Sequence, residues 1–243
     1  MEISKGIEIV DLGLKVGKTL IIADIHIGFE EALNKQGVMV PRFQFKDVVE
    51  RLEKMIKKAK PEIIIVNGDI KHEFGTISDQ EWRETLKILD LLAKSSKKVV
   101  LVKGNHDTIL GPIARKRNVE IVEQYVINKG KVLVVHGHKE IKIPKETKTI
   151  VIAHEHPAIS IREGVRVEVY KCFLTGKYKG KELIVLPSFN LVTEGTDILK
   201  ESLLSPMLKQ NLDDFKVYIV GEEVYGFGKV KDIIKNNKKF DFS

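Results

Sequence analysis

Seven histidines and a few carboxylate and amide residues are the side chains of this sequence best suited to chemistry. Five of the histidines lie at or just beyond the end of a predicted apolar strand, and the other two follow within three residues of such a position. Imidazole, carboxylate and amide groups can bind a metal ion, transfer a proton or orient one another. The histidines are His26, His72, His106, His136, His138, His154 and His156, and Asp24, Asp69 and Asn105 stand in similar positions.

The stretch Gly104-Asn105-His106-Asp107 shows this arrangement clearly. It follows the apolar run Val99–Val102, which is typical of a buried strand. Gly104 permits a sharp turn, and three polar side chains follow it. Open α/β sheets place their ligand sites beyond the carboxyl ends of their strands, so this position favours a functional site.

Side chains at the carboxyl ends of neighbouring strands converge in space. Mixed imidazole and oxygen donors suit a first-row divalent ion such as Mn, Fe, Co or Zn. A single isolated histidine is usually structural, but the confinement of all seven to strand ends argues against that interpretation. Seven donors are too many for one ion and fit two. The donors that we expect to face one another are Asp24, His26, Asp69, Asn105, His136, His154 and His156.

This donor set predicts a specific chemistry. Asp69 is the natural bridge between two ions, because Gly68 before it permits close approach. Two ions about 3.5–4 Å apart form a clamp for in-line displacement at phosphorus and lower the pKa of a bridging water. His106 is left over from the ligands. We expect it to act as the general acid that protonates the leaving alkoxide, with Asp107 holding its tautomer.

Hydrophobic periodicity predicts the elements that position these residues. The first half reads as a parallel α/β unit, in which Ser78 and Glu81 form a capping box at a helix start. The second half reads as closely spaced strands. The predicted strands are 7–10, 19–23, 63–66, 98–102, 119–122, 125–127, 131–135, 149–153, 165–175, 181–187 and a hairpin over 215–227, and the predicted helices are 29–36 (or a loop), 45–60, 78–95 and 109–117.

The motifs, taken in order, resemble those of the calcineurin-like metallophosphoesterases. The matching blocks are Asp24-Ile25-His26, Gly68-Asp69, Gly104-Asn105-His106-Asp107, His136 and Ala153-His154-Glu155-His156. The resemblance implies an α/β fold, a four-layer α/β/β/α sandwich of two mixed β-sheets flanked by helices. Ala153 stands where that family usually has glycine, and we expect only a small backbone adjustment there.

The resemblance also implies a role for each residue. Asp24, His26 and His156 would bind the first metal. Asn105, His136 and His154 would bind the second, Asp69 would bridge, and His106 would be catalytic. The cofactors implied are two divalent metal ions, most simply Mn, with Fe, Co, Ni or Zn as alternatives. More narrowly, the chain is similar to archaeal phosphoesterases related to the repair nuclease SbcD and to bacterial ligase-associated phosphoesterases.

Several residues near the motifs have two interpretations. His72 either contacts substrate phosphate or supports the donors around it. His138 either orients His136 or faces solvent. Asn190, in the loop Ser188-Phe189-Asn190, either reaches substrate or makes local turn bonds. The cationic residues near the motifs either attract an anion or are surface charges; they are Arg42, Lys71 and Lys103.

Bulk properties narrow the class of protein. With 243 residues and 43% hydrophobic content, we expect a single domain over 1–243 with a Lys-rich tail from about 229. The net charge of +7 suits an anionic substrate or nucleic acid. The single Cys172 excludes an internal disulfide and indicates a reducing compartment. Without a signal sequence or a membrane-spanning run, we expect a cytoplasmic protein that does not bind membranes.

Three functions compete at this point. The first is a divalent-metal phosphodiesterase, including a nuclease acting on nucleic acid or nucleotides. The second is a phosphomonoesterase, and the third is a non-catalytic scaffold on the same fold. Such a scaffold often loses its metal ligands, whereas this chain keeps them all. The expected partners are the phosphoester substrate, a DNA-repair helicase or ligase, and a second copy in a homodimer.

Overall fold

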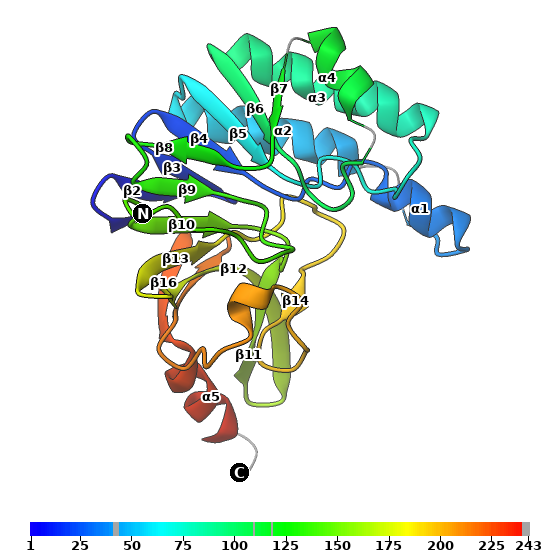
Figure 1. Cartoon of the computed structure of the whole chain (residues 1–243). Coiled ribbons are helices and arrows are strands. Elements are labelled where there is room, and N and C mark those ends of the chain that lie inside the picture. The colour runs from blue at the N-terminus through cyan, green and yellow to red at the C-terminus, as the bar shows by residue number, and fades with distance from the viewer. Residues whose placement is uncertain (41–43, 109, 118, 240–243) are drawn as a thin grey trace.

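The structure is a computed structural model that describes residues 1–40, 44–108, 110–117 and 119–239 (Figure 1). Arg42, a candidate for attracting an anion, lies outside these described residues. The described chain forms two sheets that pack face to face, with helices on the outer side of the first (Figure 1). This confirms the α/β sandwich of two mixed sheets that the sequence predicts.

The first sheet has seven strands in sequence order, antiparallel from β1 to β4 and parallel from β4 to β7. Continuous apolar runs form its centre, where Ile65 of β5 lies opposite Ile21 of β4 and Val100 of β6. The short strands β1 and β3 were not predicted. The strands are β1 Glu2–Ser4, β2 Ile7–Val10, β3 Gly13–Val16, β4 Thr19–Ile22, β5 Ile63–Asn67, β6 Lys98–Val102 and β7 Glu120–Val122.

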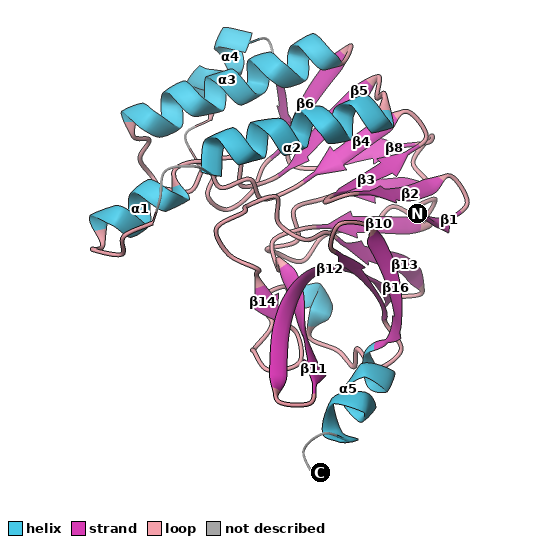
Figure 2. Cartoon of the chain, turned by 180° about the vertical axis from the view of Figure 1, so that it is seen from behind, coloured by secondary structure: helices cyan, strands magenta, loops and turns pink. Residues whose placement is uncertain are grey.

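Helices cover the outer face of the first sheet (Figure 2). The long helices α2 Gln44–Ala59 and α3 Asp79–Ser95 agree with the predicted ranges, and Val48 and Leu52 of α2 are fully buried at helical spacing. Ser78 and Glu81 form the predicted capping box. The shorter helices are α1 Phe29–Lys35 and α4 Gly111–Arg117.

The second sheet is mixed, with β10 parallel to both β9 and β13. Its strand β11 was not predicted, because the segment begins with Pro157 and carries polar residues. Proline is tolerated there because it is the first residue of the strand. The strands are β8 Tyr125–Ile127, β9 Val132–Val134, β10 Thr149–Ile152, β11 Pro157–Glu163, β12 Arg166–Tyr178, β13 Lys181–Val185, β14 Thr196–Asp197, β15 Lys216–Val220 and β16 Val224–Lys229.

The outer face of the second sheet has a thinner cover than that of the first. It consists of the 3-10 helix η1 Pro206–Leu208, the loop that follows it, and helix α5 Val230–Lys239. Helix α5 occupies the segment expected as a Lys-rich tail. Its residues Val230 and Ile233 are buried against the sheet at helical spacing, which explains why the segment folds.

The inner faces of the two sheets share one core. Val66 and Val100 of the first sheet belong to the same buried cluster as Val134, Val151 and Phe173 of the second. This packing brings the carboxyl ends of β4, β5, β6, β9 and β10 to one edge of the sandwich, and the motif residues follow those ends directly. None of the helices in the described residues is long and apolar enough to cross a membrane.

Candidate active site

Five loops that follow strand ends carry the proposed donors, and backbone hydrogen bonds connect the loop after β4 to the loop after β5 and to a sixth loop, after β13. The N–H of Asp24 donates to the carbonyl of Gly68 (3.1 Å), and that of His26 donates to the carbonyl of Asp69 (3.0 Å). The N–H of Asn190 donates to the carbonyl of Asp24 (3.0 Å), which adds the loop after β13. These hydrogen bonds fix the positions of the loops relative to one another, and they therefore also fix where the side chains of the loops begin.

Unusual backbone conformations concentrate in these loops. Non-glycine residues rarely adopt positive φ, because the conformation places Cβ too close to the backbone. Half of the ten described non-glycine residues with positive φ lie in the site. Strain of this kind persists where the surrounding structure requires it and is common at functional sites. The five are Asp24 (φ 53°), His26 (49°), Asp69 (47°), His154 (67°) and His156 (51°).

The first group of donors is Asp24, His26 and His156, whose ligand atoms lie within 4.8 Å of one another. The Nε2 atoms of the two histidines are 3.3 Å apart, and Nε2 of His156 is 3.4 Å from Oδ2 of Asp24. Asp24 is fully buried, yet its Oδ1 lacks a hydrogen-bond partner among the described residues. A buried carboxylate oxygen without a donor is costly, so a cation fits this position.

The second group is Asp69, His136 and His154, again within 4.8 Å. Nε2 of His136 is 3.2 Å from Oδ2 of Asp69 and 3.1 Å from Oδ1 of Asn105. On its other side, Nδ1 of His136 is 3.0 Å from the carbonyl oxygen of Asn67. Such a contact leaves Nε2 as the ligand atom, as is usual for metal-binding histidines.

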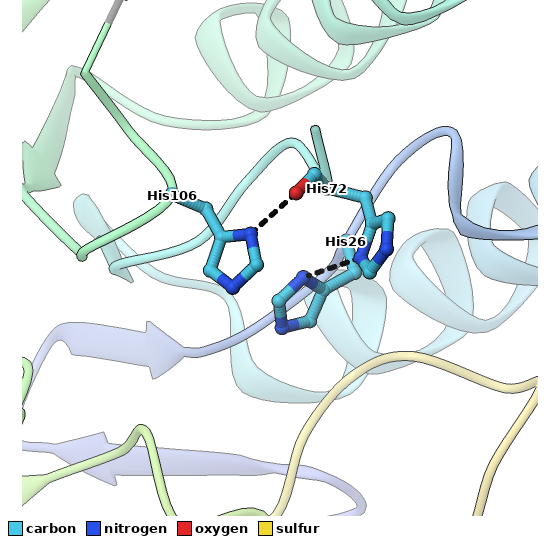
Figure 3. A group of neighbouring side chains, drawn as sticks. All are labelled: His26, His72 and His106. Atoms are coloured by element: carbon cyan, nitrogen blue, oxygen red, sulfur yellow. Dashed lines mark hydrogen bonds between the residues drawn. The ribbon is translucent and has the colours of Figure 1, made fainter. Parts of the chain in front are cut away.

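His106 and His72 form a third group with His26 (Figure 3). Nδ1 of His106 hydrogen-bonds to the backbone carbonyl of His72, and its Nε2 lies 4.0 Å from Oδ2 of Asp69. Nδ1 of His72 lies 3.4 Å from Nδ1 of His26, on the side of the His26 ring away from His156. His26 therefore belongs to both groups: one ring nitrogen faces His156, and the other faces His72.

Asp107 has a different role from the one that the sequence predicts. Its carboxylate accepts hydrogen bonds from the backbone N–H groups of Asp69 (2.7 Å), Ile70 (3.2 Å) and Gly104 (3.0 Å). The expectation that it holds the tautomer of His106 is therefore wrong. The carbonyl of His72 takes that place, because the Asp107 side chain turns back toward the loop after β5. Asp107 instead holds the loop that carries Asp69.

Electrostatics favour the neutral form of two of the proposed ligand histidines. Burial and the neighbouring His156 lower the pKa of His26 to about 3, and burial and His136 lower that of His154 to about 4. Neutral imidazole is the form that binds a metal. Burial would also lower the pKa of His136, but Asp69 and Asp24 raise it to about 9. Burial and Asp69 raise the pKa of Asp107 to about 7.

Two glycines permit the close packing of the donors. A Cβ on Gly68 would lie 2.0 Å from Nδ1 of His136, and the φ of Gly68 is +85°. A Cβ on Gly104 would lie 2.1 Å from Oδ1 of Asp69. The structure thus gives Gly68 the close approach that the sequence suggests. Ala153, by contrast, is accommodated without a positive φ.

The structure shows the contacts of the residues near the motifs for which the sequence allows two interpretations. Asn190 is buried, and its Oδ1 accepts hydrogen bonds from the N–H groups of Val192 (2.7 Å) and Thr193 (3.4 Å), so a role in substrate binding stays a prediction. The ring of His138 is 5.3 Å from that of His136. Lys71 is fully buried and donates to the carbonyl of Glu73, whereas Lys103 pairs with Glu123 at 3.8 Å.

Sequence reasoning missed the supporting carboxylates. Glu81 accepts hydrogen bonds from the N–H groups of His72 (3.1 Å) and Glu73 (2.8 Å), so the capping box of α3 also holds the His72 loop. Glu155 accepts from Leu204 (2.9 Å) and Ser205 (2.8 Å). Its place between two histidines was the only signal in the sequence.

Phe74 was also missed as a site residue. Its ring centroid is 3.7 Å from that of His106, and 58% of the residue is exposed. Large apolar side chains are usually buried, so an exposed ring in contact with a site histidine is noteworthy. Its position five residues after Asp69 gave no hint of this contact.

Fold and site together define a metal-binding α/β sandwich with donors from five strand ends. The chain belongs to the calcineurin-like phosphoesterase family, whose sequence profile matches residues 17–199. This confirms the resemblance at the level of that family, while the narrower likeness to SbcD-related proteins stays a prediction. No curated protein matches the chain in sequence.

Solved structures are similar in fold. The crystal structure of the Pseudomonas putida nuclease MPE aligns with a TM-score of 0.60 and 19% identity over 90% of this chain and 93% of that chain. The E. coli phosphoesterase Yfce aligns with a TM-score of 0.44 and 15% identity over 87% of this chain and 97% of that chain. The likeness to the nuclease supports the fold.

Proposed function

We propose that this calcineurin-like phosphoesterase is a divalent-metal phosphodiesterase that acts on nucleic acid or nucleotides with two metal ions. The observation that carries the proposal is the pair of donor groups, each within 4.8 Å, that lie at one sheet edge beside His106. The mixed imidazole and oxygen donors suit a first-row divalent ion; by the family resemblance we propose Mn, with Fe, Co, Ni or Zn as alternatives.

In this proposal Asp24, His26 and His156 would hold one ion and Asn105, His136 and His154 would hold the other, with Asp69 as a ligand shared by both. When bound, the ions supply an activated water and neutralise phosphate oxygens. Oδ1 of Asp24 has no hydrogen-bond donor among the described residues, although Nδ1 of His136 lies 3.7 Å away. This oxygen and the lowered pKa values of His26 and His154 support the assignment.

His106 supplies the proton to the leaving group. Its Nδ1 faces the carbonyl of His72 and therefore carries a hydrogen, so Nε2 is the atom that exchanges a proton with substrate. Nε2 lies 4.0 Å from Oδ2 of Asp69, beside the second donor group rather than within it. A general acid must lie within reach of the leaving oxygen, and the position of His106 beside the donor groups supports this role.

The exposed ring of Phe74 favours a nucleotide substrate. Aromatic side chains beside a phosphate site bind nucleobases by stacking, and this contributes about 1–3 kcal/mol per base. The net charge of +7 suits a polyanion. The structurally similar Pseudomonas putida protein is a nuclease, which supports the same substrate class. The likeness to SbcD-related proteins extends the proposal to a repair helicase or ligase as partner.

A comparison of two chromogenic substrates tests the reaction. With Mn²⁺ added, bis-p-nitrophenyl phosphate should be turned over faster than p-nitrophenyl phosphate. Equal or faster turnover of the monoester would favour the phosphomonoesterase, and no turnover of either with any of the five metals would favour the scaffold.

A second experiment tests the substrate class. Single- and double-stranded DNA, RNA and cyclic nucleotides are assayed with the wild type and with Phe74→Ala. The variant should raise KM for nucleotide substrates, because it removes the ring on which a base would stack. Phe227→Ala is the matched control, because Phe227 is 44% exposed and lies on β16 away from the donor groups. Equal effects of both variants would contradict a stacking role.

A further inference from the structure

The hairpin of β11 and β12 projects from the second sheet (Figures 1 and 2). Its strands are joined at Gly164 and Val165. Only residues 166–171 of β12 pair with β11, and residues 172–175 pair with β15. The outer half of β12 therefore has one side paired with β11 and a second side that forms an edge of the hairpin.

The outer edge of β11 is covered. The N–H of Arg162 donates to Oδ1 of Asn237 (3.2 Å), Nδ2 of Asn237 donates to the carbonyl of Ser160 (3.0 Å), and the N–H of Ser160 donates to Oδ1 of Asp197 (3.4 Å). These backbone groups point away from β12. In an antiparallel pair, residues opposite such positions also direct their N–H and C=O groups outward.

The alternating hydrogen-bond pattern of an antiparallel pair shows which N–H and C=O groups of β12 point away from β11. Arg162 lies opposite Val167, and Ser160 lies opposite Val169. The N–H groups of Val167 and Val169 therefore face away from β11, and neither has a hydrogen-bond partner in the part of the chain that the structure describes. Val167 is 47% exposed and Val165 is fully exposed. An open edge of this kind is a template for another strand.

We propose that a second copy of this chain pairs with the edge of β12, antiparallel about a two-fold axis at Val167. Val167 then lies opposite Val167 of the second copy, and the outward N–H and C=O groups of each bond to the other. In the same register Arg166 lies opposite Glu168 of the second copy, and Glu168 lies opposite its Arg166. The sequence is thus complementary to itself, as a two-fold interface requires.

The surface next to the edge has room for the second hairpin. In this register Val165 of the second copy lies opposite Val169. A cavity of about 710 Å³ begins there, and Val169, Leu191 and Val220 provide apolar parts of its wall. The exposed tip of each hairpin therefore enters the cavity of the other copy, which removes apolar surface from water on both sides.

Charge reversal tests the register. Sedimentation equilibrium of the full chain should show a dimer, and Arg166→Glu or Glu168→Arg alone should weaken it by about tenfold or more, because each places like charges opposite one another. A mixture of the two variants restores opposite charges at both positions, so it should form a heterodimer of near wild-type affinity. A monomeric wild type, or a mixture no tighter than either variant alone, would overturn the proposal.

Disulfide trapping tests the two-fold contact. Val167→Cys should form a disulfide-linked dimer on mild oxidation, because the two Cβ atoms lie opposite one another across the axis. Val126→Cys is the matched control, since Val126 is 48% exposed on β8 and the only native cysteine, Cys172, is buried. Equal crosslinking of both variants would contradict the interface. Neither experiment depends on phosphoesterase activity.

Discussion

The carboxylate of Asp107 accepts a hydrogen bond from the backbone N–H of Asp69, with 2.7 Å between the nitrogen and Oδ2. The same carboxylate binds the N–H groups of Ile70 and Gly104, so one side chain after β6 fixes the loop after β5. Asp69 is the residue proposed to bridge two metal ions. Its position therefore depends on Asp107, which lies outside the proposed set of ligands.

Replacing Asp107 should destabilise the protein and weaken metal binding together. Asp107→Ala leaves three buried N–H groups without an acceptor, and a buried unsatisfied group costs roughly 1–3 kcal/mol. We expect the free energy of unfolding in urea to fall by about 3 kcal/mol and Mn²⁺ affinity, measured by calorimetry, to fall as well. Asp107→Asn, which keeps one oxygen, should show smaller losses. An unchanged unfolding curve for Asp107→Ala would refute this role.

Replacing His106 should separate catalysis from metal binding. Loss of a general acid typically lowers kcat by about 10²- to 10⁴-fold, so His106→Asn should lose turnover yet bind the same number of Mn²⁺ ions. His138→Asn is the control, because His138 lies beside His136 but outside the three donor groups. A lower metal stoichiometry for His106→Asn would instead make His106 a ligand, as its group with His26 and His72 would permit.

A methyl group at Gly68 should disrupt the site. Gly68→Ala places a Cβ 2.0 Å from Nδ1 of His136, in addition to the strain of alanine at positive φ. Gly180→Ala isolates the second effect, since Gly180 has a φ of +75° and nothing within 4 Å of the added Cβ. We expect Gly180→Ala to lower stability by about 1 kcal/mol with normal activity. Gly68→Ala should lose metal binding, and equal behaviour of the two variants would exclude the steric argument.

Lys171 should make stability depend on pH. Burial lowers its pKa to about 8, while its Nζ bonds to Ser188 and to the carbonyls of Thr193 and Glu194. The unfolded chain, with a pKa near 10.5, binds more protons than the folded protein between pH 8 and 10.5. Stability from this residue therefore rises with pH across that window.

The measurement for Lys171 is a comparison of urea unfolding curves of the wild type and Lys171→Met at pH 7.5 and 10.5. All other groups titrate alike in both proteins, so the difference isolates Lys171. Because one pKa unit corresponds to about 1.4 kcal/mol, the wild type should gain on the order of 3 kcal/mol relative to the variant at the higher pH. A constant difference would show that Lys171 keeps its ordinary pKa.

Local patterns in the sequence are enough to specify the central elements and the donor types. Strands β4, β5 and β6 are continuous apolar runs that can only be buried, and α2 and α3 repeat apolar residues at helical spacing. Such patterns are readable before any packing is known. The parallel order of those strands predicts that Asp24, His26, Asp69 and Asn105 converge, whereas the donors after β9 and β10 join them through the packing of the second sheet on the first.

Tertiary structure settled the features that depend on partners distant in sequence. Strand β11 mixes apolar and polar residues and starts at Pro157, and it becomes a strand through its pairing with β12. Helix α5 folds because Val230 and Ile233 meet the second sheet. Asp107 lies next to His106 in the chain, yet its carboxylate binds backbone groups of Asp69 and Ile70. The hydrogen-bond partners of a loop side chain depend on which other loops lie beside it in the folded protein, and no local sequence pattern specifies those neighbours.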